Sequence, residues 1–179
     1  MGYLGESLLT ALELIINFDR EVRITAWVSL YTSSCAIVIA ALLGVPTGLW
    51  LGLNRFRGRQ ILLALLNTLM ALPTVVVGLL LFGLLSRQGP LGPLGLLFTP
   101  LAMIAGQTVL ATPIVANLVR AAVTGADQRI INTALTLGAS RCQAAIQLLR
   151  ERRFGVMAAV IAGFGRGIAE VGVAMMRGG

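Results

Sequence analysis

Long stretches without charged residues are the feature that most constrains this chain. The first runs from Ile24 to Leu53 without an acidic or basic side chain, and an α-helix needs only about 20 apolar residues to cross a bilayer. Over the whole sequence 57% of residues are hydrophobic and 12% are charged, a balance typical of membrane proteins. We therefore expect an all-α polytopic membrane protein with four spans, at about residues 24–53, 61–86, 97–119 and 154–176.

Residues 1–23 are expected to form an external helix that lies along the membrane surface. Glu6 and Glu13 interrupt the apolar positions and no basic residue precedes them, so the segment does not have the pattern of a secretory signal. Its apolar run is too short to span the bilayer. Residues 24–179 are expected to form the transmembrane domain, with a cytoplasmic loop at 125–153.

The basic residues are all arginines, and they indicate topology. The 14 Lys plus Arg exceed the 7 Asp plus Glu, but they form no basic stripe with interleaved aromatic residues, so we expect no nucleic-acid partner. Cytoplasmic loops carry an excess of arginine, which places the loop 125–153 in the cytoplasm and the N-terminus outside. Nine arginines lie at span ends on the cytoplasmic side and four on the other: Arg55, Arg57, Arg59, Arg120, Arg129, Arg141, Arg150, Arg152 and Arg153 against Arg20, Arg23, Arg87 and Arg177.

Missing residue types exclude several kinds of active site. Without Lys there is no G-x-x-x-x-G-K-[ST] phosphate loop, and without His there is neither a Ser-His-Asp arrangement nor an imidazole metal site. The sequence therefore predicts no catalytic residue, no metal and no cofactor. Cys35 and Cys142 are expected at different depths, so they are poor candidates for a disulfide.

The segment from Asp127 to Arg153 is a polar and basic island in this apolar sequence. It predicts two short helices: Asp127 caps the first, Gly138 ends it in the left-handed conformation, and Ser140 forms a capping box with Gln143 at the start of the second. The first helix carries too much apolar surface for water. It either docks on a partner protein or lies on the lipid surface, and the island alone does not distinguish the two.

Polar and charged residues inside the spans indicate contact with protein or with a water-filled path. Pro73 removes a backbone donor in the middle of the second span, which predicts a kink or an unwound break. Arg166 and Glu170 lie four residues apart on one face of the fourth span and are expected to pair, more as a structural bridge than as a substrate ligand. The residues that we assign to a path or gate are Pro73, Thr74, Gln107, Thr108, Thr112, Arg166 and Glu170.

Small residues on the fourth span predict close helix packing. Ala159, Gly163 and Gly167 form a ridge of small residues at a spacing of four, which lets another helix approach closely. We expect the fourth helices to pack at the centre of an assembly. The neighbouring GFGRG glycines are not interpreted as a dinucleotide site, because no βαβ pattern surrounds them.

Four motifs in order give the sequence a family resemblance: ALPTVVVGLLL from Ala71, SRQGPLGPLG from Ser86, TALTLGAS from Thr133 and AGFGRGIAEVG from Ala162. The third resembles the cytoplasmic "EAA" loop, E-A-A-x-x-x-G, of permease subunits of binding-protein-dependent ABC importers. Together the motifs are most similar to the tungstate permeases of the molybdate/tungstate branch. The sequence departs from the pattern in several places. Asn132-Thr133 replaces its acidic residue and first alanine, Arg150-Glu151 stands where many permeases have Leu-Pro, and Arg177 stands where an apolar residue is expected. The family's further C-terminal span is not evident after Arg177.

The resemblance implies a type I (MetI-like) importer permease in a bacterial or archaeal cytoplasmic membrane. It implies a homodimer, an external oxyanion-binding protein and a separate cytoplasmic ATPase that drives alternating access, with membrane lipid around the dimer. The residues that it assigns to ATPase coupling are Asn132, Thr133, Ala134, Leu137, Gly138, Ala139 and Ser140.

Alternative functions remain open at this point. Molybdate is the next substrate after tungstate, followed by sulfate or phosphate. A passive anion channel or a membrane scaffold, whose basic island binds anionic lipid, belongs to a different class. An intramembrane enzyme is disfavoured, because Glu170 is the only plausible acid and no nucleophile lies beside it.

Overall fold

The computed structural model describes residues 20–54, 56–124 and 128–176. Most of these residues lie in helices. No strand occurs in these ranges, so the all-α prediction is confirmed. The predicted N-terminal helix at 1–23 lies largely outside them. The elements are α2 (Arg20–Leu53), α3 (Arg59–Ala71), α4 (Thr74–Leu85), the 3-10 helix η1 (Gly92–Leu94), α5 (Pro100–Thr124), α6 (Gln128–Thr136), α7 (Arg141–Glu151) and α8 (Arg153–Met176).

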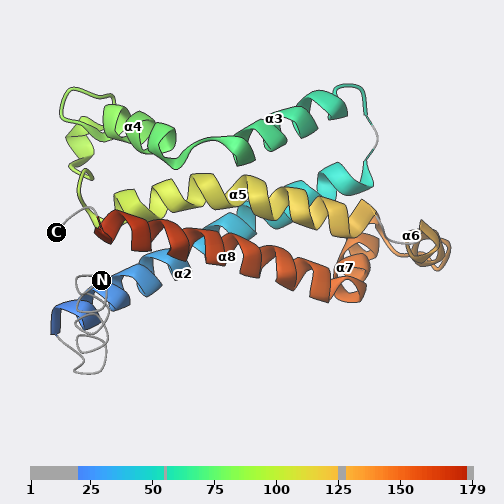
Figure 1. Cartoon of the computed structure of the whole chain (residues 1–179). Coiled ribbons are helices and arrows are strands. Elements are labelled where there is room, and N and C mark those ends of the chain that lie inside the picture. The colour runs from blue at the N-terminus through green and yellow to red at the C-terminus, as the bar shows by residue number, and fades with distance from the viewer. Residues whose placement is uncertain (1–19, 55, 125–127, 177–179) are drawn as a thin grey trace, which may run out of the picture.

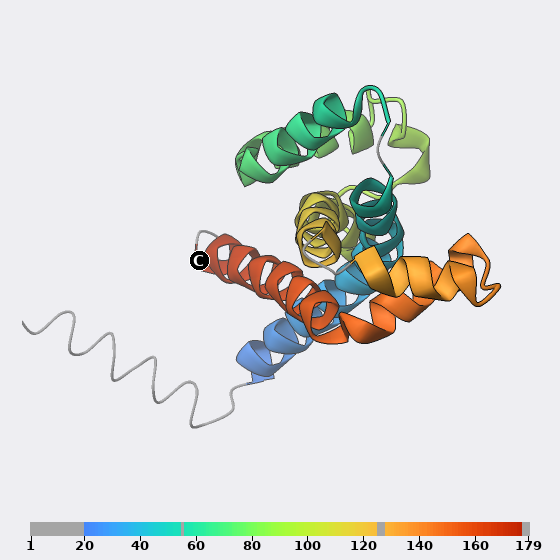
Figure 2. The same ribbon diagram turned by 90° about the vertical axis from the view of Figure 1, so that its right-hand side faces the viewer.

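Three long helices, α2, α5 and α8, pack against one another and form the core (Figure 1). The α3–α4 pair lies along the other side of α5, and α6 and α7 extend from one end of the bundle (Figures 1 and 2). Apart from Leu148, the core is made of small and β-branched side chains that allow close helix contacts: Ile37, Ala40, Ala111, Val115, Val119, Val123 and Ala159.

The predicted spans correspond to helices with shifted ends. Among the described residues, 23–53 and 100–124 form helices long and apolar enough to cross a membrane, and α3 and α4 count as a third if the bent pair is one span. The third predicted span, 97–119, begins instead at Pro100 and continues to Thr124, because residues 97–99 lie in a turn in which Phe98 has a φ of 63°. The predicted span 154–176 matches the extent of α8, and its crossing of the membrane stays a prediction.

The contact between α2 and α5 depends on glycines spaced four residues apart. A Cβ at Gly44 would lie 3.0 Å from the carbonyl oxygen of Thr112, and one at Gly48 would collide with the carbonyl of Ala116. α2 is continuous helix from Arg20 to Leu53. These glycines therefore bring two helix backbones together, as small residues do inside membranes.

The small-residue ridge of α8 packs within the same chain. A Cβ at Gly163 would lie 2.9 Å from Ile37 Cδ1 on α2 and 3.0 Å from Val115 Cγ2 on α5, and Ala159 is only 1% exposed. The ridge does bring helices close, as predicted, but its partners are α2 and α5. A central place for α8 in an assembly would have to use the opposite face of the helix.

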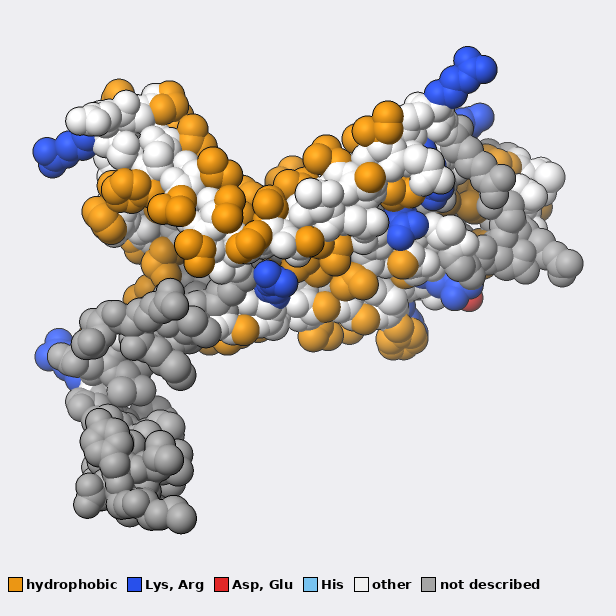
Figure 3. Space-filling view, turned by 45° about the horizontal axis from the view of Figure 1, so that its top comes forward, with side chains coloured by type: hydrophobic (Ala, Val, Ile, Leu, Met, Phe, Trp, Pro, Cys, Tyr) orange, Lys and Arg blue, Asp and Glu red, His pale blue; other side chains and the backbone are white. Residues whose placement is uncertain are grey.

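The second predicted span is broken in the middle. α3 and α4 meet at an angle of 94°, and Leu72 and Pro73 between them are both extended, with ψ angles of 129° and 134°. Proline disfavours helical geometry in the residue before it and cannot donate a hydrogen bond of its own. The break is thus an unwound corner, and the two arms border a V-shaped hollow with mostly hydrophobic flanks (Figure 3).

Candidate functional site

The α6–α7 unit is a corner with well-defined geometry at one end of the molecule. Gly138, two residues after the end of α6 at Thr136, has a φ of 86°. Ala139 N–H donates to the carbonyl of Ala134 at 3.0 Å and Gly138 N–H donates to that of Leu135 at 3.1 Å, the hydrogen-bond pair of a Schellman motif. The predicted left-handed residue is confirmed at Gly138.

α7 begins with the predicted capping box. Ser140 N–H donates to Gln143 Oε1 at 2.8 Å, and Gln143 N–H donates to Ser140 Oγ at 3.3 Å. The two bonds satisfy backbone donors that a helix start leaves open. The turn closes the end of α6 and the box closes the start of α7, so residues 137–140 form a short connection between the two helices. The predicted cap of α6, Asp127, lies outside the described residues.

Buried side chains anchor this corner to the core. On α7, Ala144 is 2% exposed and Leu148 is fully buried. On α6, Ile130 and Ile131 are half-buried against the core. The apolar surface that sequence analysis assigned to either a partner protein or the lipid surface is therefore divided, because one part of it joins α6 to its own chain.

The rest of α6 and its turn face outward. Leu137 is 82% exposed and Leu135 is 41% exposed. Six of the seven predicted coupling residues line or border this surface as exposed or half-buried positions beside Leu137: Asn132, Thr133, Ala134, Gly138, Ala139 and Ser140. A groove of about 610 Å³ runs along it between α6 and α7, lined by Ile130, Thr133, Ala134, Leu137, Ala139, Gln143 and Gln147. The sequence-predicted coupling residues thus form one continuous surface with an exposed leucine and an adjoining groove.

Three of the predicted path residues are directed into the bundle. Thr108 Oγ1 donates to the carbonyl of Ile104 at 2.7 Å, with the carbonyl of Ala36 on α2 at 3.5 Å. Thr112 Oγ1 donates to the carbonyl of Thr108 at 2.7 Å, and Gln107 is 8% exposed. The two hydroxyls bond mainly to their own helix, as such groups commonly do.

The other predicted path residues lie on outer surfaces. Pro73 is exposed and Thr74 half-buried at the corner between α3 and α4, and Arg166 is exposed on α8. Glu170 lies on the same helix, but its side chain is outside the described residues, so its pairing with Arg166 stays a prediction. Pro73 and Arg166 therefore belong to surfaces that a second chain or water can reach.

Sequence analysis missed a polar network that joins α3 to α5. Asn117 Nδ2 donates to Asn67 Oδ1 at 2.7 Å, and Arg120 Nε donates to Asn117 Oδ1 at 2.9 Å. The sulfur of Met70 lies 3.2 Å from the same Asn117 nitrogen. α3 has no buried residue of its own, and this network and the hydrogen bond from Arg59 to Leu51 of α2 attach it to the bundle.

Arginines and aromatic residues mark the end of the bundle that carries α6 and α7. Arg59 Nε donates to the carbonyl of Leu51 at 2.9 Å and so caps the last turn of α2. Trp50 stacks on Phe56 with ring centroids 4.6 Å apart, and the Arg153 guanidinium lies 4.9 Å from the ring centre of Phe154. Aromatic and basic residues are enriched where helices leave the bilayer, which agrees with a membrane surface at this level.

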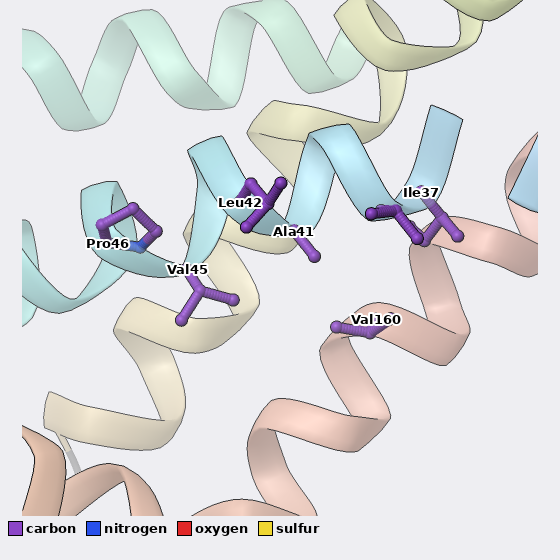
Figure 4. A pocket seen from close by; sticks show the side chains of 7 residues that line it. Ile37, Ala41, Leu42, Val45, Pro46 and Val160 are labelled. Atoms are coloured by element: carbon purple, nitrogen blue, oxygen red, sulfur yellow. The ribbon is translucent and has the colours of Figure 1, made fainter. Parts of the chain in front are cut away.

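The side of the bundle shared by α2 and α8 is apolar. A groove of about 440 Å³ lies between them (Figure 4). Its lining includes Leu42, which is 70% exposed, and Val160 of α8. Such a surface suits lipid tails. No group of three or more acidic, Cys or His side chains that could hold a metal occurs among the described residues.

Comparison with known proteins gives a consistent result. A family model described as "Binding-protein-dependent transport system inner membrane component" matches residues 44–178. A probable anion ABC transporter permease protein of Haloferax volcanii is 41% identical over 164 residues, which are 92% of this chain and 70% of that protein. The tungstate uptake system permease proteins TupB of Peptoclostridium acidaminophilum and Campylobacter jejuni are 37% and 36% identical over 179 residues, 100% of this chain and 78% and 75% of theirs.

Proposed function

Because the chain belongs to the family of binding-protein-dependent transport system inner membrane components, we propose that it is the permease subunit of an ATP-driven oxyanion importer, with tungstate as its substrate. The observation that carries the substrate is the 36–37% identity, along the whole chain, to two tungstate uptake permeases. Molybdate, an anion of the same shape and charge, is the alternative. A separate cytoplasmic subunit hydrolyses ATP, and an external binding protein delivers the anion.

The α6–α7 corner is the docking surface for the ATPase. Leu137 is 82% exposed at its tip, and the Schellman turn and capping box fix the two helices relative to each other. Leu148 roots α7 in the core. A rigid corner of this kind moves as one body with the ATPase and transmits that movement to the bundle. Small shifts at such a site become larger rearrangements of packed helices.

The outer face of α8 and the α3–α4 corner border the path between two copies of the chain. In Figure 2 the α3–α4 pair lies above α5 and α8 lies below it. Ala158, Ala162 and Arg166 are exposed at a spacing of four on α8. An arginine facing lipid at the bilayer centre costs about 2.5–3.5 kcal/mol on insertion scales, which supports a protein or water environment for this face.

Weak, multiple contacts suit conduction of an anion. The first turn of α4 supplies backbone N–H groups at Thr74, where a helix dipole favours negative charge. Arg166 and its predicted partner Glu170 supply one charged contact on α8. Gln107, Thr108 and Thr112 lie on α5 inside the bundle, behind the path.

Docking is tested by comparing two exposed leucines at opposite ends of the bundle. Leu137→Ser should abolish co-purification of the ATPase subunit in detergent while leaving the melting temperature of the permease unchanged. Leu94→Ser is the matched control, because Leu94 is 61% exposed near α4. A complex that survives Leu137→Ser as well as it survives Leu94→Ser would exclude the corner as the docking site.

The dimer contact is tested by cross-linking cysteines in a variant with Cys35 and Cys142 replaced by serine. Ala162→Cys on the outer face of α8 should form a disulfide-linked dimer. Leu42 on α2 is also exposed but lies on the proposed lipid side, so Leu42→Cys should not form a linked dimer. The reverse pattern would contradict the proposed interface.

The substrate is tested in proteoliposomes that contain the permease, its ATPase and the binding protein. Tungstate should stimulate ATP hydrolysis at a lower concentration than molybdate, and sulfate should require the most. A passive anion channel would instead carry tungstate without ATP. An intact complex that no oxyanion stimulates would refute the substrate while leaving the docking result in place.

A further inference from the structure

A pocket of about 470 Å³ lies between the last turns of α2 and the α6–α7 corner. Apolar side chains form much of its wall: Leu49, Trp50 and Leu53 of α2, and Ile131 and Leu135 of α6. Arg141, the first residue of α7, is exposed and also lines it. The described residues around the pocket include no acidic side chain. The pocket therefore combines an apolar wall with one positive charge.

This pocket is separate from the groove that we assign to the docked ATPase. Thr133 and Leu137 of α6 line the groove, whereas Ile131 and Leu135 of the same helix line the pocket. The two hollows share no described lining residue, and α2 contributes to the pocket alone. An occupant of the pocket would therefore not compete directly with the ATPase.

The pocket adjoins the apolar groove between α2 and α8. Pro46 lines both hollows, and Figure 4 shows Pro46 at one end of the groove and Ile37 at the other. The helix from Ile37 to Pro46 rises by about 13 Å, close to half of the roughly 30 Å hydrocarbon core of a bilayer. An apolar surface as deep as one lipid leaflet thus leads along α2 to the pocket that contains Arg141.

The end of α2 carries the residues expected at the level of lipid headgroups. Residues 23–53 are long and apolar enough to cross a membrane. Trp50, which stacks on Phe56, lines the pocket, and tryptophan is enriched where helices meet the headgroups. Arginine at this level attracts anionic lipids.

We propose that the pocket binds the headgroup of an anionic phospholipid. The Arg141 guanidinium donates charge-assisted hydrogen bonds to the phosphate, and one acyl chain follows the groove along α2 toward Ile37. A free anion would leave the apolar wall of the pocket in water, whereas a lipid covers it. The bound lipid fastens the α6–α7 corner to the membrane. The proposal needs α2 in a bilayer but no transported anion, so it does not rest on the proposed substrate.

Cys142 reports on the pocket directly, because it lines the pocket and is exposed. In the full-length permease with Cys35→Ser, a neutral maleimide should label Cys142 more slowly in phosphatidylglycerol nanodiscs than in phosphatidylcholine nanodiscs. The matched control is Gln147→Cys with both native cysteines replaced by serine. Gln147 is exposed on the same helix but lines the other groove, so its labelling rate should be equal in the two lipids.

Equal rates at Cys142 in the two lipids would overturn the proposal. Equal slowing at Cys142 and at the Gln147→Cys position would also overturn it, because that is an effect of surface charge alone. Inorganic phosphate added to phosphatidylcholine nanodiscs should not protect Cys142; protection by phosphate would assign the pocket to a free anion. Protection that requires the ATPase, in either lipid, would assign the pocket to that subunit.

The charge of Arg141 should set the lipid preference. Arg141→Gln should reduce the ratio of the two labelling rates by about fivefold, and Arg150→Gln should preserve it, because Arg150 is exposed on α7 outside the pocket. Native mass spectrometry of the unmodified permease gives a reading that needs no variant. After release from nanodiscs of both lipids, the permease should retain phosphatidylglycerol in preference to phosphatidylcholine, and equal retention would contradict the proposal.

Discussion

α5 packs on two neighbours in contrasting ways. Toward α2 it offers Val115 and Val119, both fully buried, to a row of glycines that lets the backbones touch. Toward α3 it offers Asn117 and a polar network, and α3 buries none of its own residues. The α2 contact is dry and continuous, whereas the α3 contact is polar and narrow. We infer from this difference that α2 and α5 form a rigid frame and that α3 can move relative to α5.

Substitution of Gly48 in the α2–α5 contact should lower the stability of the protein more than the other substitutions proposed below. A methyl group there collides with the carbonyl of Ala116, and its second neighbour is Val119 Cβ at 2.9 Å. Backbone atoms cannot step aside as side chains do, so Gly48→Ala should cost about 3 kcal/mol and lower the melting temperature of the detergent-purified protein by roughly 6–12 °C. Gly78→Ala is the control, because no atom lies within 4 Å of a Cβ at Gly78 in α4.

Gly48→Ala and Gly78→Ala with equal melting temperatures would mean that α2 does not pack on α5 through its glycines. Gly52, where a Cβ would make a contact of intermediate closeness, provides a further test. Its Cβ would meet Val123 at 3.2 Å, so Gly52→Ala should fall between the two.

The α3 contact should depend on one amide. Asn117→Leu removes the bonds to both Asn67 and Arg120, and interhelical hydrogen bonds in membranes are worth about 0.6–2 kcal/mol. The melting temperature should fall by a few degrees, and a cysteine on α3 should become more reactive. Thr68→Ala is the control, since the Thr68 hydroxyl bonds only to Ala64 of its own helix. The Asn67→Leu/Asn117→Leu double variant should be no worse than Asn117→Leu alone, whereas additive losses would show that the two amides act separately.

Removal of Pro73 should change the angle between α3 and α4 more than it changes the stability of the protein. Pro73→Ala lets α3 continue into α4 and open the 94° corner, with a stability change within about 1 kcal/mol. Spin labels at the far ends of α3 and α4 should move apart, and ATP-driven transport should fall. Pro46→Ala is the control, because Pro46 lies within the continuous helix α2. An unchanged label distance would show that α5 and the flanking loops, and not the proline, impose the corner.

Local signals in the sequence predicted the α6–α7 corner well. Gly138, Ser140 and Gln143 act through hydrogen bonds that span only a few residues, and each is confirmed. The resemblance to ABC importer permeases is confirmed by the family model and by relatives over the full chain. Charge-free runs likewise predicted the helices, with ends that shifted where Phe98 adopts a left-handed turn.

Partners that are distant in sequence could not be predicted. A glycine such as Gly48 signals either a bend or a close approach, and the choice depends on which helix lies opposite. Asn67 and Asn117 are fifty residues apart, and their pairing follows only from the bend between α3 and α4. Helical periodicity places Gln107 on a face, but it does not say that α2 and α8 cover that face.

The smallest effect is expected at the α6–α7 corner. Ser140→Ala removes one half of the capping box and should cost about 1 kcal/mol, too little to unfold a helix rooted by Leu148. Because the box fixes the angle between α6 and α7, ATP hydrolysis should become less dependent on substrate while the ATPase stays bound. Thr136→Ala is the control, since the Thr136 hydroxyl bonds only to Thr133 within α6. Faster amide exchange at the start of α7 in the Ser140 variant alone would attribute the uncoupling to the cap, and equal exchange in both variants would assign the stiffness of the corner to the Schellman turn at Gly138.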